Sequence, residues 1–491
     1  MERVRTQSYT LTLELCFDRN NPVLVLEKLC HSATSLYNCC LNECLRRLHS
    51  YERDPEYHKL KKEYRKAKKA RHSLKPFKER FNIIAEKHGY TTNQLEKFLN
   101  EVRKSHFPNF GSAECQALAK RAFAAVEKVR MGKASRVRFH AMRDGTSFEG
   151  KASNSKLHYS RKTGCVHYGS YVFRLKIKPD DQYAMLCLMD DVKYVRVLKR
   201  IIRSKTRWYA QLILKGIPPC NQRHKTTYGV GSAGIDPGIS TMAFVSNEDA
   251  RLYELAPGIA ENEAEIRRVN RAMDRSRRAN NPQNYNSDGT LKKGRLRWKN
   301  SKRYIRLRNR RKELYRLCKV KREISHHILA KEILAKSSFI KTESMSYKGL
   351  AKRSKKTSQN SSNGKYNSKK RYGGTIHARA PARLIAILNE KLGYKGMSVE
   401  KVNTKTVRAS QYNPLDGTYQ KKELRDRMID LGNNTIVQRD LLSAYCILHT
   451  TASNDAIDPR SAYDHFGKFK QLNDLEVARL RNEKTLMLYT S

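Results

Sequence analysis

The chain has 491 residues, of which 39% are hydrophobic, so it is long enough for two to four folded modules. It carries 100 Lys and Arg against 47 Asp and Glu, which gives a formal net charge of +53 at pH 7. Such a surplus repels itself and requires a polyanion to neutralise it, and nucleic acid is the obvious polyanion. No stretch of about 18 apolar residues is present, which excludes a chain that spans a membrane, and no membrane partner is expected.

The cysteines indicate a reducing compartment. Eleven are present, an odd number, and none falls in a C-x-x-C pair. The densest group is Cys39, Cys40 and Cys44, which we expect to be small buried hydrophobic residues rather than part of a disulfide framework. The first residues, MERVRTQSYTLTLELCF, alternate like a strand and lack the apolar core of a signal peptide. We therefore expect a cytoplasmic, nucleoid-associated bacterial protein.

Residues 8–16 alternate apolar and polar side chains, which predicts a half-buried β-strand. Pro22 marks the first turn of a helix whose apolar positions recur at helical spacing. A second, strongly basic helix is predicted over 56–71, and a third over about 112–129 with Ser112 as its N-cap. The pattern indicates a helical module that is inserted after one strand.

The pattern changes to β-structure between about 134 and 217. The stretches YVFRLKIK, KYVRVLKRII and RWYAQLILKG alternate and are separated by turn-forming segments, which predicts a small barrel to which the first strand returns. The basic side chains on these strands are either solvated edge charges or a surface that follows phosphates, and both interpretations stay open. They are Arg174, Lys176, Lys178, Arg196, Lys199 and Arg200.

A further module begins near Gly231, where SAGIDPGISTMAFVSNEDARLYELA predicts three strands joined by tight turns. A long basic helical region follows. Sixteen of residues 292–322 are Lys or Arg and only Glu313 is acidic, whereas a merely solvated helix normally interleaves Glu with Lys. An apolar stripe would let this helix dock on one side while its other surface faces something negative. The stripe consists of Tyr304, Leu307, Leu314, Leu317 and Ile324.

Shorter elements complete the chain. Strands are predicted over 337–343 and 398–402, and a helix over about 380–392. Between them, KGLAKRSKKTSQNSSNGKYNSKKRYGG is rich in Ser, Asn, Gly and Lys, which indicates a loop. Residues 404–435 are polar and irregular, VQRDLLSAYCILH predicts a helix, and the tail beyond residue 450 is expected to be peripheral.

Three acidic residues stand out by their local context. Asp236 ends a strand in AGIDPGIS, Glu343 ends the strand FIKTE, and Asp440 opens the helix in QRDLLSAY. Each alone has an ordinary explanation, as a turn residue, a surface acid or a helix N-cap. The order of strands and helices, however, is that of an RNase H-type core, in which the first and fourth strands lie side by side and the last helix packs across them. This order predicts a single site formed by all three acids.

Three carboxylates at close range repel one another unless divalent cations bridge them. Oxygen ligands suit Mg²⁺, with Mn²⁺ as the alternative, and two such ions could activate a water and steady the leaving oxygen in an in-line displacement. We therefore predict that Asp236, Glu343 and Asp440 are both the catalytic residues and the metal ligands of an endonuclease.

The motifs GIDPGIS, KTESMSYKGL and QRDLLSAY resemble the three RuvC motifs of transposon-encoded TnpB nucleases, which compact type V CRISPR effectors share. The resemblance extends through most of the chain, and QALAKRAFAAVEKVRMGKASRVRF resembles the stretch where that family passes from recognition helices into its barrel. It implies RNA-guided cleavage of DNA. A guide RNA pairs with one strand of a double-stranded DNA target beside a short motif that the protein reads, and the protein holds the RNA–DNA heteroduplex by its backbone.

The fold class that this resemblance implies is multidomain α+β, with a wedge-type β-barrel, an inserted helical recognition module and an RNase H-like (RuvC) α/β nuclease domain. The expected boundaries, in chain order, are the first barrel strand (1–20), the recognition module (21–132), the remaining barrel strands (133–228), the nuclease core with a long basic helical insertion (229–402), a segment that loads target nucleic acid (403–436), the helix of the third motif (437–450) and a C-terminal tail (451–491).

One departure from the family is plain. The family usually carries a four-cysteine zinc ribbon just before the third motif, and this interval holds no cysteine, so no zinc is expected. The segment SQYNPLDGTYQKKELRDRMIDLGNN takes its place, with Gln411, Tyr412 and Tyr419 as stacking or hydrogen-bonding groups and a plain polar loop as the alternative. The third motif reads QRDLLSA where many members have DRD and NAA, but its acid is retained.

The predicted nucleic-acid-binding residues come from the basic region and from this segment. They are Arg295, Arg297, Lys299, Arg303, Arg306, Arg310, Gln411 and Tyr412.

Two other functions stay open. An RNA-guided DNA-binding repressor without cleavage would keep the scaffold, but it should have lost at least one of the three acids. An RNase H-like transposase or resolvase that acts without RNA would need neither the long basic helices nor the barrel.

Overall fold

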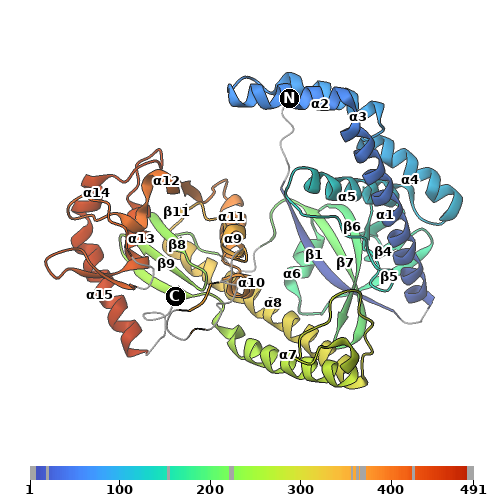
Figure 1. The fold of residues 1–491 in the computed structure, drawn as a ribbon. Helices are drawn as coiled ribbons and strands as arrows, with labels where there is room; N and C mark the ends of the chain where they lie inside the picture. Colours follow the sequence, from blue (N-terminus) through green and yellow to red (C-terminus); the bar gives the residue numbers. More distant parts are fainter. Residues whose placement is uncertain are drawn as a thin grey trace. The chain divides into compact units, whose positions relative to one another are not determined.

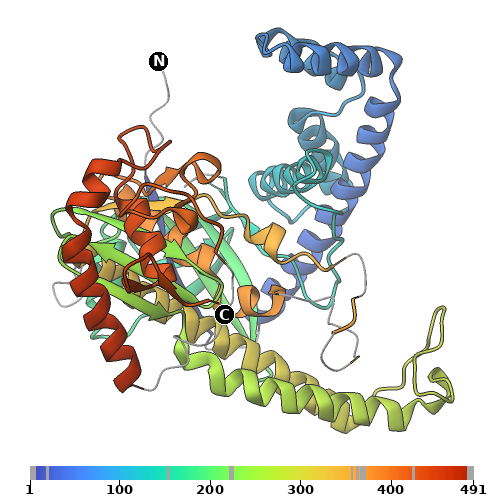
Figure 2. The same cartoon turned by 60° about the vertical axis from the view of Figure 1, so that its left-hand side comes forward.

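The computed structural model divides into two compact units, 1–224 and 225–491, each of which is described by itself (Figures 1 and 2). No helix in the described part of the chain is long and apolar enough to cross a bilayer. The residues that the structure describes are 7–17, 21–151, 155–219, 226–354, 358–360, 364, 372–422 and 426–483. About half of the predicted Ser-, Asn- and Lys-rich loop, 348–374, lies outside them.

The first unit contains a seven-stranded antiparallel sheet in the order β2-β6-β7-β1-β5-β4-β3. The predicted return of the first strand is confirmed, because β1 (Ser8–Cys16) lies between β7 and β5 and pairs Leu11 with Leu212. Its alternate leucines are buried, as the alternation predicts. The other strands are β2 (Phe148–Glu149), β3 (Leu157–Ser160), β4 (Cys165–Tyr168), β5 (Tyr171–Lys176), β6 (Val192–Ile202) and β7 (Lys205–Lys215).

The helices of this unit form one core with the sheet, and Cys40 and Cys44 are fully buried in it, whereas Cys39 is partly exposed. The prediction that Ser112 is an N-cap is wrong. The cap is Gly111, because its N–H donates to the Tyr168 hydroxyl and because Glu114 fills the space beside it that a Cβ would need. Three helices were not predicted, α3, α4 and α6. The helices are α1 (Asn21–Arg53), α2 (Pro55–Lys69), α3 (Lys75–Lys87), α4 (Thr92–His106), α5 (Ser112–Arg130) and α6 (Gln182–Leu188).

The second unit is built on a five-stranded sheet in the order β10-β9-β8-β11-β12. The first three strands in sequence are antiparallel, β11 runs parallel to β8, and β12 runs parallel to β11. The prediction that the first and fourth strands of this sheet, β8 and β11, lie side by side is therefore confirmed. The strands are β8 (Ser232–Pro237), β9 (Thr241–Ser246), β10 (Ala250–Glu254), β11 (Phe339–Glu343) and β12 (Glu400–Val402).

Helices cover both faces of this sheet. On one face, Ile235, Phe244 and Ile340 pack against α8 (Lys302–Lys336) and α11 (Pro381–Gly393). On the other, Ala243 and Val245 pack against α13 (Arg439–Leu448). Because neighbouring residues of a strand point to opposite faces, each strand contributes to both layers. The mixed α+β class that the sequence predicts is confirmed.

The basic region 292–322 is not a single helix, which corrects that prediction. Helix α7 (Ala260–Asn280) is followed by a connection, and α8 begins only after Ser301, whose hydroxyl caps the Tyr304 N–H at 3.1 Å. The buried Asn281 holds the connection by accepting from the Lys299 N–H at 2.6 Å. The apolar stripe also differs, because Ile324 is 55% exposed whereas Leu314 and Cys318 are buried against α7. The two helices lie side by side (Figure 2).

The C-terminal tail is not peripheral, which corrects a second prediction. Helices α14 (Pro459–Asp464) and α15 (Phe466–Asn482) complete the core around α13, and Phe469 stacks on Tyr445 with ring centroids 4.3 Å apart. The buried Glu476 carboxylate accepts from the Leu252 N–H of edge strand β10 at 2.8 Å. The helix therefore closes an exposed sheet edge.

Replacing Glu476 by Ala should lower the free energy of unfolding by roughly 2–3 kcal/mol, because the Leu252 N–H is buried and would lose its acceptor. The measurement is urea unfolding of the nucleic-acid-free chain. The adjacent Leu475→Ala on the same helix is the control, since Leu475 is 69% exposed and its loss should cost less than about 0.5 kcal/mol. Equal effects of the two variants would contradict a structural role of the tail.

Candidate active site

The site is built on a close contact between strand β8 and helix α13. A Cβ atom added at Gly234 would lie 2.0 Å from the Ala444 carbonyl oxygen and 2.6 Å from the Leu448 nitrogen. Two backbones can approach this closely only where one of them has no side chain. Gly234 therefore determines where the helix crosses the strand.

This crossing brings two of the predicted acids together. Asp236 lies two residues after Gly234 and so on the same face of β8, and Asp440 lies one helical turn before Ala444 in α13. Strand β11 supplies the third, because Thr342 pairs with Ile235 in parallel register and Glu343 follows at the strand end. The structure thus places Asp236, Glu343 and Asp440 at one end of the sheet, on the face that α13 covers.

The electrostatics show that the three carboxylates interact. The pKa of Asp236 is raised well above its usual value, first by burial and then by the negative charges of Asp440 and Glu343, while Arg439 opposes the shift. Burial also raises the pKa of Glu343. Burial and repulsion thus both oppose the ionised form of Asp236, and burial opposes the ionised form of Glu343.

Asp440 has a different environment. Arg427 donates to its Oδ2 at 2.8 Å, and Arg439 donates to its Oδ1 from Nε at 3.1 Å and from Nη2 at 2.9 Å. All three side chains are less than a fifth exposed, at 12% for each arginine and 17% for Asp440. Two guanidinium groups thus neutralise this acid in the nucleic-acid-free protein.

Sequence reasoning missed both arginines. Arg439 could have been found, because it directly precedes the acid in QRDLLSAY. Arg427 has no local signal. It reaches Asp440 only because β13 (Met428–Asp430) pairs with β14 (Ile436–Gln438), so that the Arg439 N–H donates to the Arg427 carbonyl at 2.9 Å.

Tyr347 is another residue that sequence reasoning missed. It begins the short helix α9 (Tyr347–Leu350), and its hydroxyl donates to the Pro237 carbonyl at 3.1 Å, one residue after Asp236. Burial raises the pKa of this phenol, and the nearby Asp236 raises it further. Tyr347 therefore remains a neutral hydrogen-bond donor that ties α9 to the end of β8.

The donor set fits a hard divalent cation. Carboxylate oxygens are the ligands that Mg²⁺ and Mn²⁺ prefer, and a bound cation would stabilise the ionised forms of Asp236 and Glu343, which burial disfavours. Across the described ranges, no three His, Cys, Asp or Glu side chains already converge as a metal site. Asp440, paired with two arginines, would have to exchange one of these contacts for a cation.

The predicted nucleic-acid-binding residues of the basic region lie on the surface. Arg303 and Arg306 are exposed on α8, whereas Arg310 forms an ion pair with Glu265 of α7 at 2.8 Å. The other three lie in the connection that precedes α8 and not on a helix; they are Arg295, Arg297 and Lys299.

The prediction that Tyr412 is a nucleic-acid-binding residue is wrong. Its side chain is 2% exposed and packs in the core beneath α13, so it cannot stack on a base. Tyr419, whose ring lies 5.1 Å from that of Tyr412, is 40% exposed and carries the Arg408 guanidinium over its face at 4.4 Å. Gln411, in the turn before Tyr412, is partly exposed, and its predicted role stays a prediction.

No protein-family model and no curated protein matches this chain. The solved structures that resemble it include the "Cryo-EM structure of the Cas12f1-sgRNA-target DNA complex", with 9% identity over 89% of this chain and 98% of that chain and a TM-score of 0.42. They also include the "Cryo-EM structure of CRISPR-Cas12f Ternary Complex", with 13% identity, coverage of 88% and 82%, and a TM-score of 0.26. At these values the likeness supports no statement about the activity of this chain.

Gly234→Ala should separate α13 from β8, because the new methyl group would overlap a backbone carbonyl that no side-chain rotation can move. We expect a loss of about 2 kcal/mol or more in unfolding free energy and loss of any activity of the three acids. Urea unfolding and a nuclease assay measure the two effects.

The matched control is Gly467→Ala in α15, where nothing lies within 4 Å of the added Cβ and Ala is the better helix former. If Gly234→Ala were as stable as this control, the contact would not determine the site.

Proposed function

We propose that the chain is a divalent-metal-dependent nuclease with an RNase H-like core, and that Asp236, Glu343 and Asp440 form its active site. The observation that carries the proposal is the meeting of the three acids at one end of the sheet, where β8 and β11 are parallel neighbours and α13 crosses at Gly234. A strongly basic chain has no structural need for acids gathered in one place, because each could instead pair with one of many cations.

The chemistry follows from the donor set. When bound, Mg²⁺ or Mn²⁺, as one ion or a pair, supplies positive charge for a phosphodiester and for its leaving oxygen. Asp236 and Glu343 would hold the metal, and Asp440 would join them on leaving an arginine. Either Arg427 or Arg439, once released, could contact the anionic phosphate of the substrate. Tyr347 keeps α9 against the end of β8 and so limits the opening of the site.

We further propose that the nuclease is guided by RNA. The net charge of +53 requires a long polyanion, and the helix pair α7–α8 presents exposed arginines such as Arg303 and Arg306. Together with the resemblance of the three motifs to TnpB and compact type V effectors, this supports a guide RNA, a DNA duplex with a short adjacent motif and an RNA–DNA heteroduplex as partners. Base pairing would then supply the sequence specificity that a backbone-binding surface lacks.

The same proposal assigns the modules. The seven-stranded sheet would be the wedge barrel, helices α1 to α5 the recognition module, and the segment 403–436 a zinc-free target-loading segment. Stoichiometric zinc in the purified protein would contradict the last assignment.

One observation favours the alternative of a guided DNA-binding protein without cleavage. Arg427 and Arg439 already neutralise Asp440, as they would in a site that has given up its metal. Retention of all three acids favours the nuclease, and a cleavage assay separates the two.

Asp236→Ala should abolish Mg²⁺-dependent cleavage, by at least about a thousandfold, while it leaves guide-dependent DNA binding within about twofold, because this carboxylate is proposed to act on the metal rather than on the nucleic-acid backbone. Glu248→Ala is the control, since that acid is exposed at the turn after β9 and outside the site. Cleavage by Asp236→Ala at the normal rate would refute the site, and no cleavage by the wild type with its co-purified RNA would support the binding-only alternative.

Reversing the charge of Arg303 and Arg306 together to Glu should weaken RNA or heteroduplex binding and flatten its salt dependence, by about 0.7–0.9 in log–log slope for each phosphate that these two side chains neutralise. Filter binding across a range of salt concentrations gives both quantities. The control reverses Arg460 and Lys468, which are 93% and 52% exposed on the C-terminal helices and give the same change in net charge. Identical slopes for the two double variants would show that α8 is not a nucleic-acid surface.

A further inference from the structure

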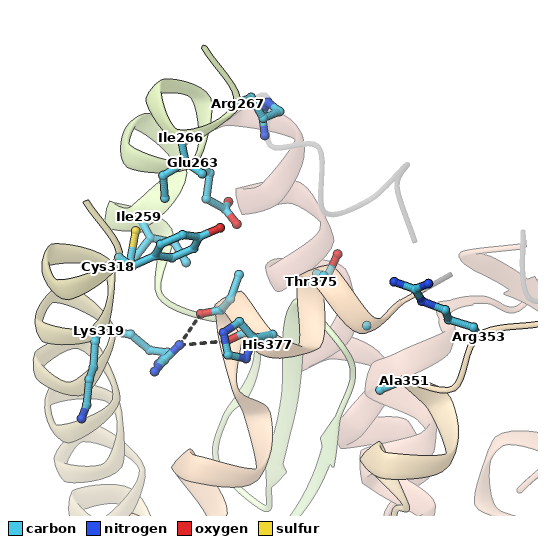
Figure 3. A pocket seen from close by; sticks show the side chains of 15 residues that line it. Ile259, Glu263, Ile266, Arg267, Cys318, Lys319, Ala351, Arg353, Thr375 and His377 are labelled. Atoms are coloured by element: carbon cyan, nitrogen blue, oxygen red, sulfur yellow. Dashed lines mark hydrogen bonds between the residues drawn. The ribbon is translucent and has the colours of Figure 1, made fainter. Parts of the chain in front are cut away.

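A cavity whose lining contains none of the three acids lies between α7, α8 and α10 (Gly373–Arg379). Its volume is about 940 Å³, which is in the upper part of the range for sites that hold a small molecule or a single nucleotide. Figure 3 shows Arg267 and Glu263 on α7, Cys318 and Lys319 on α8, and Thr375 on α10 around this space.

Hydrogen bonds to backbone carbonyls make the walls of this pocket rigid. Arg322 of α8 donates to the carbonyls of His377 and Ala378 at 2.9 and 3.0 Å. Arg379 donates to the carbonyls of Leu255 and Ala256 at 2.8 and 2.6 Å, which ties the end of α10 to the end of β10. A pocket whose walls are held in this way loses little conformational freedom when a ligand binds.

The rim of the pocket is positively charged. Arg267, Lys319 and Arg353 line it and are exposed, and among the residues that the structure describes none of them forms an ion pair. The single acid in the lining, Glu263, lies 3.9 Å from Arg379, a guanidinium that also pairs with Glu254 at 3.2 Å. The rim therefore offers three cationic groups to an anion that the protein itself does not supply.

The floor of the pocket is apolar and carries an exposed aromatic ring. Ile259, Ile266 and Cys318 are buried beneath it, whereas Tyr315 lines it and is 48% exposed. A simple anion would need only the cations. An aromatic face together with an apolar floor and a cationic rim is instead the combination that binds an unstacked base and its flanking phosphates.

We infer that this pocket binds one unstacked nucleotide of a single-stranded nucleic acid, with its base on Tyr315 and its phosphates at Arg267, Lys319 and Arg353. The inference rests on the proposed function only in taking nucleic acid as the partner. The concave shape excludes a duplex, because the bases of a duplex are stacked inside the helix and cannot enter a pocket.

The pocket lies close to the three acids along the chain. Ala351, which lines it, directly follows α9, and Tyr347 at the start of α9 bonds to the carbonyl of Pro237 beside Asp236. One turn of helix thus connects the two sites. A nucleotide held in the pocket would anchor its strand next to the position where the acids cut.

The experiment is photo-crosslinking of single-stranded decamers to the full chain. Two decamers are used, an RNA and a DNA, each with a single 5-iodouracil, in EDTA at 150 mM salt. Mass spectrometry then identifies the crosslinked peptide. We expect a crosslink within the lining segments, reduced about tenfold in Tyr315→Ala and in Lys319→Glu but retained in Tyr315→Phe, which keeps an aromatic ring. The control Tyr463→Ala removes a tyrosine that is 60% exposed on α14 and should change nothing. The decamer with the higher crosslinking yield shows whether the pocket prefers RNA or DNA. Equal yields would show that it binds both.

Two results would overturn the inference. One is a crosslink that is unchanged in Tyr315→Ala or that maps only outside the lining. The other is displacement of the decamer by a heptamer of glutamate, equally from the wild type and from Tyr315→Ala, which would make the pocket a site for acidic peptides. Because EDTA excludes metal, the result is independent of cleavage. Failure of the Asp236→Ala test would therefore refute the nuclease proposal but not the nucleotide pocket. Failure of the crosslinking test would refute the pocket but not the nuclease.

Discussion

The contact between Gly234 and α13 is the constraint on which the second unit depends. Because the Ala444 carbonyl lies where a Cβ would be, the helix has one position on the strand and one register along it. That position places Asp440 beside Asp236, and the parallel pairing of β11 with β8 then adds Glu343. The C-terminal helix α15 packs on the outer side of α13, so the segments that surround this contact come from distant parts of the chain.

Charge balance explains the rest of the site. Burial raises the pKa values of Asp236 and Glu343, and the negative charges of Asp440 and Glu343 raise that of Asp236 further, whereas Asp440 is paired with Arg427 and Arg439. In a chain with a net charge of +53, cations that could neutralise all three acids are abundant. In the part of the chain that the structure describes, neither Asp236 nor Glu343 forms an ion pair, which is the expected state of a site that takes its positive charge from a bound ion.

The corrections to the sequence-based predictions have a common cause. Tyr412 is predicted to stack on or hydrogen-bond to nucleic acid, as part of the segment that takes the place of the zinc ribbon, but the fold places its ring beneath α13. The sequence predicts one basic helix over 292–322, but buried asparagines hold the first part of this region as a connection. It predicts a peripheral tail, although Glu476 closes the edge of the sheet. In each case a distant segment decided the environment of a residue whose local pattern was uninformative.

The sequence by itself determined most of the strands, most of the long helices and the three candidate acids, because alternation, helical periodicity and strand-end position are local properties. It did not predict the short strands β2, β3, β4, β13 and β14. It also predicted a polyanionic partner, since the net charge does not depend on the fold. Only the tertiary structure decided that Arg427 and Arg439 neutralise Asp440, that Tyr347 ties α9 to β8, and that α7, α8 and α10 enclose a pocket. These features join residues that are far apart along the chain, and the packing of the sheet and its helices is what brings them into contact.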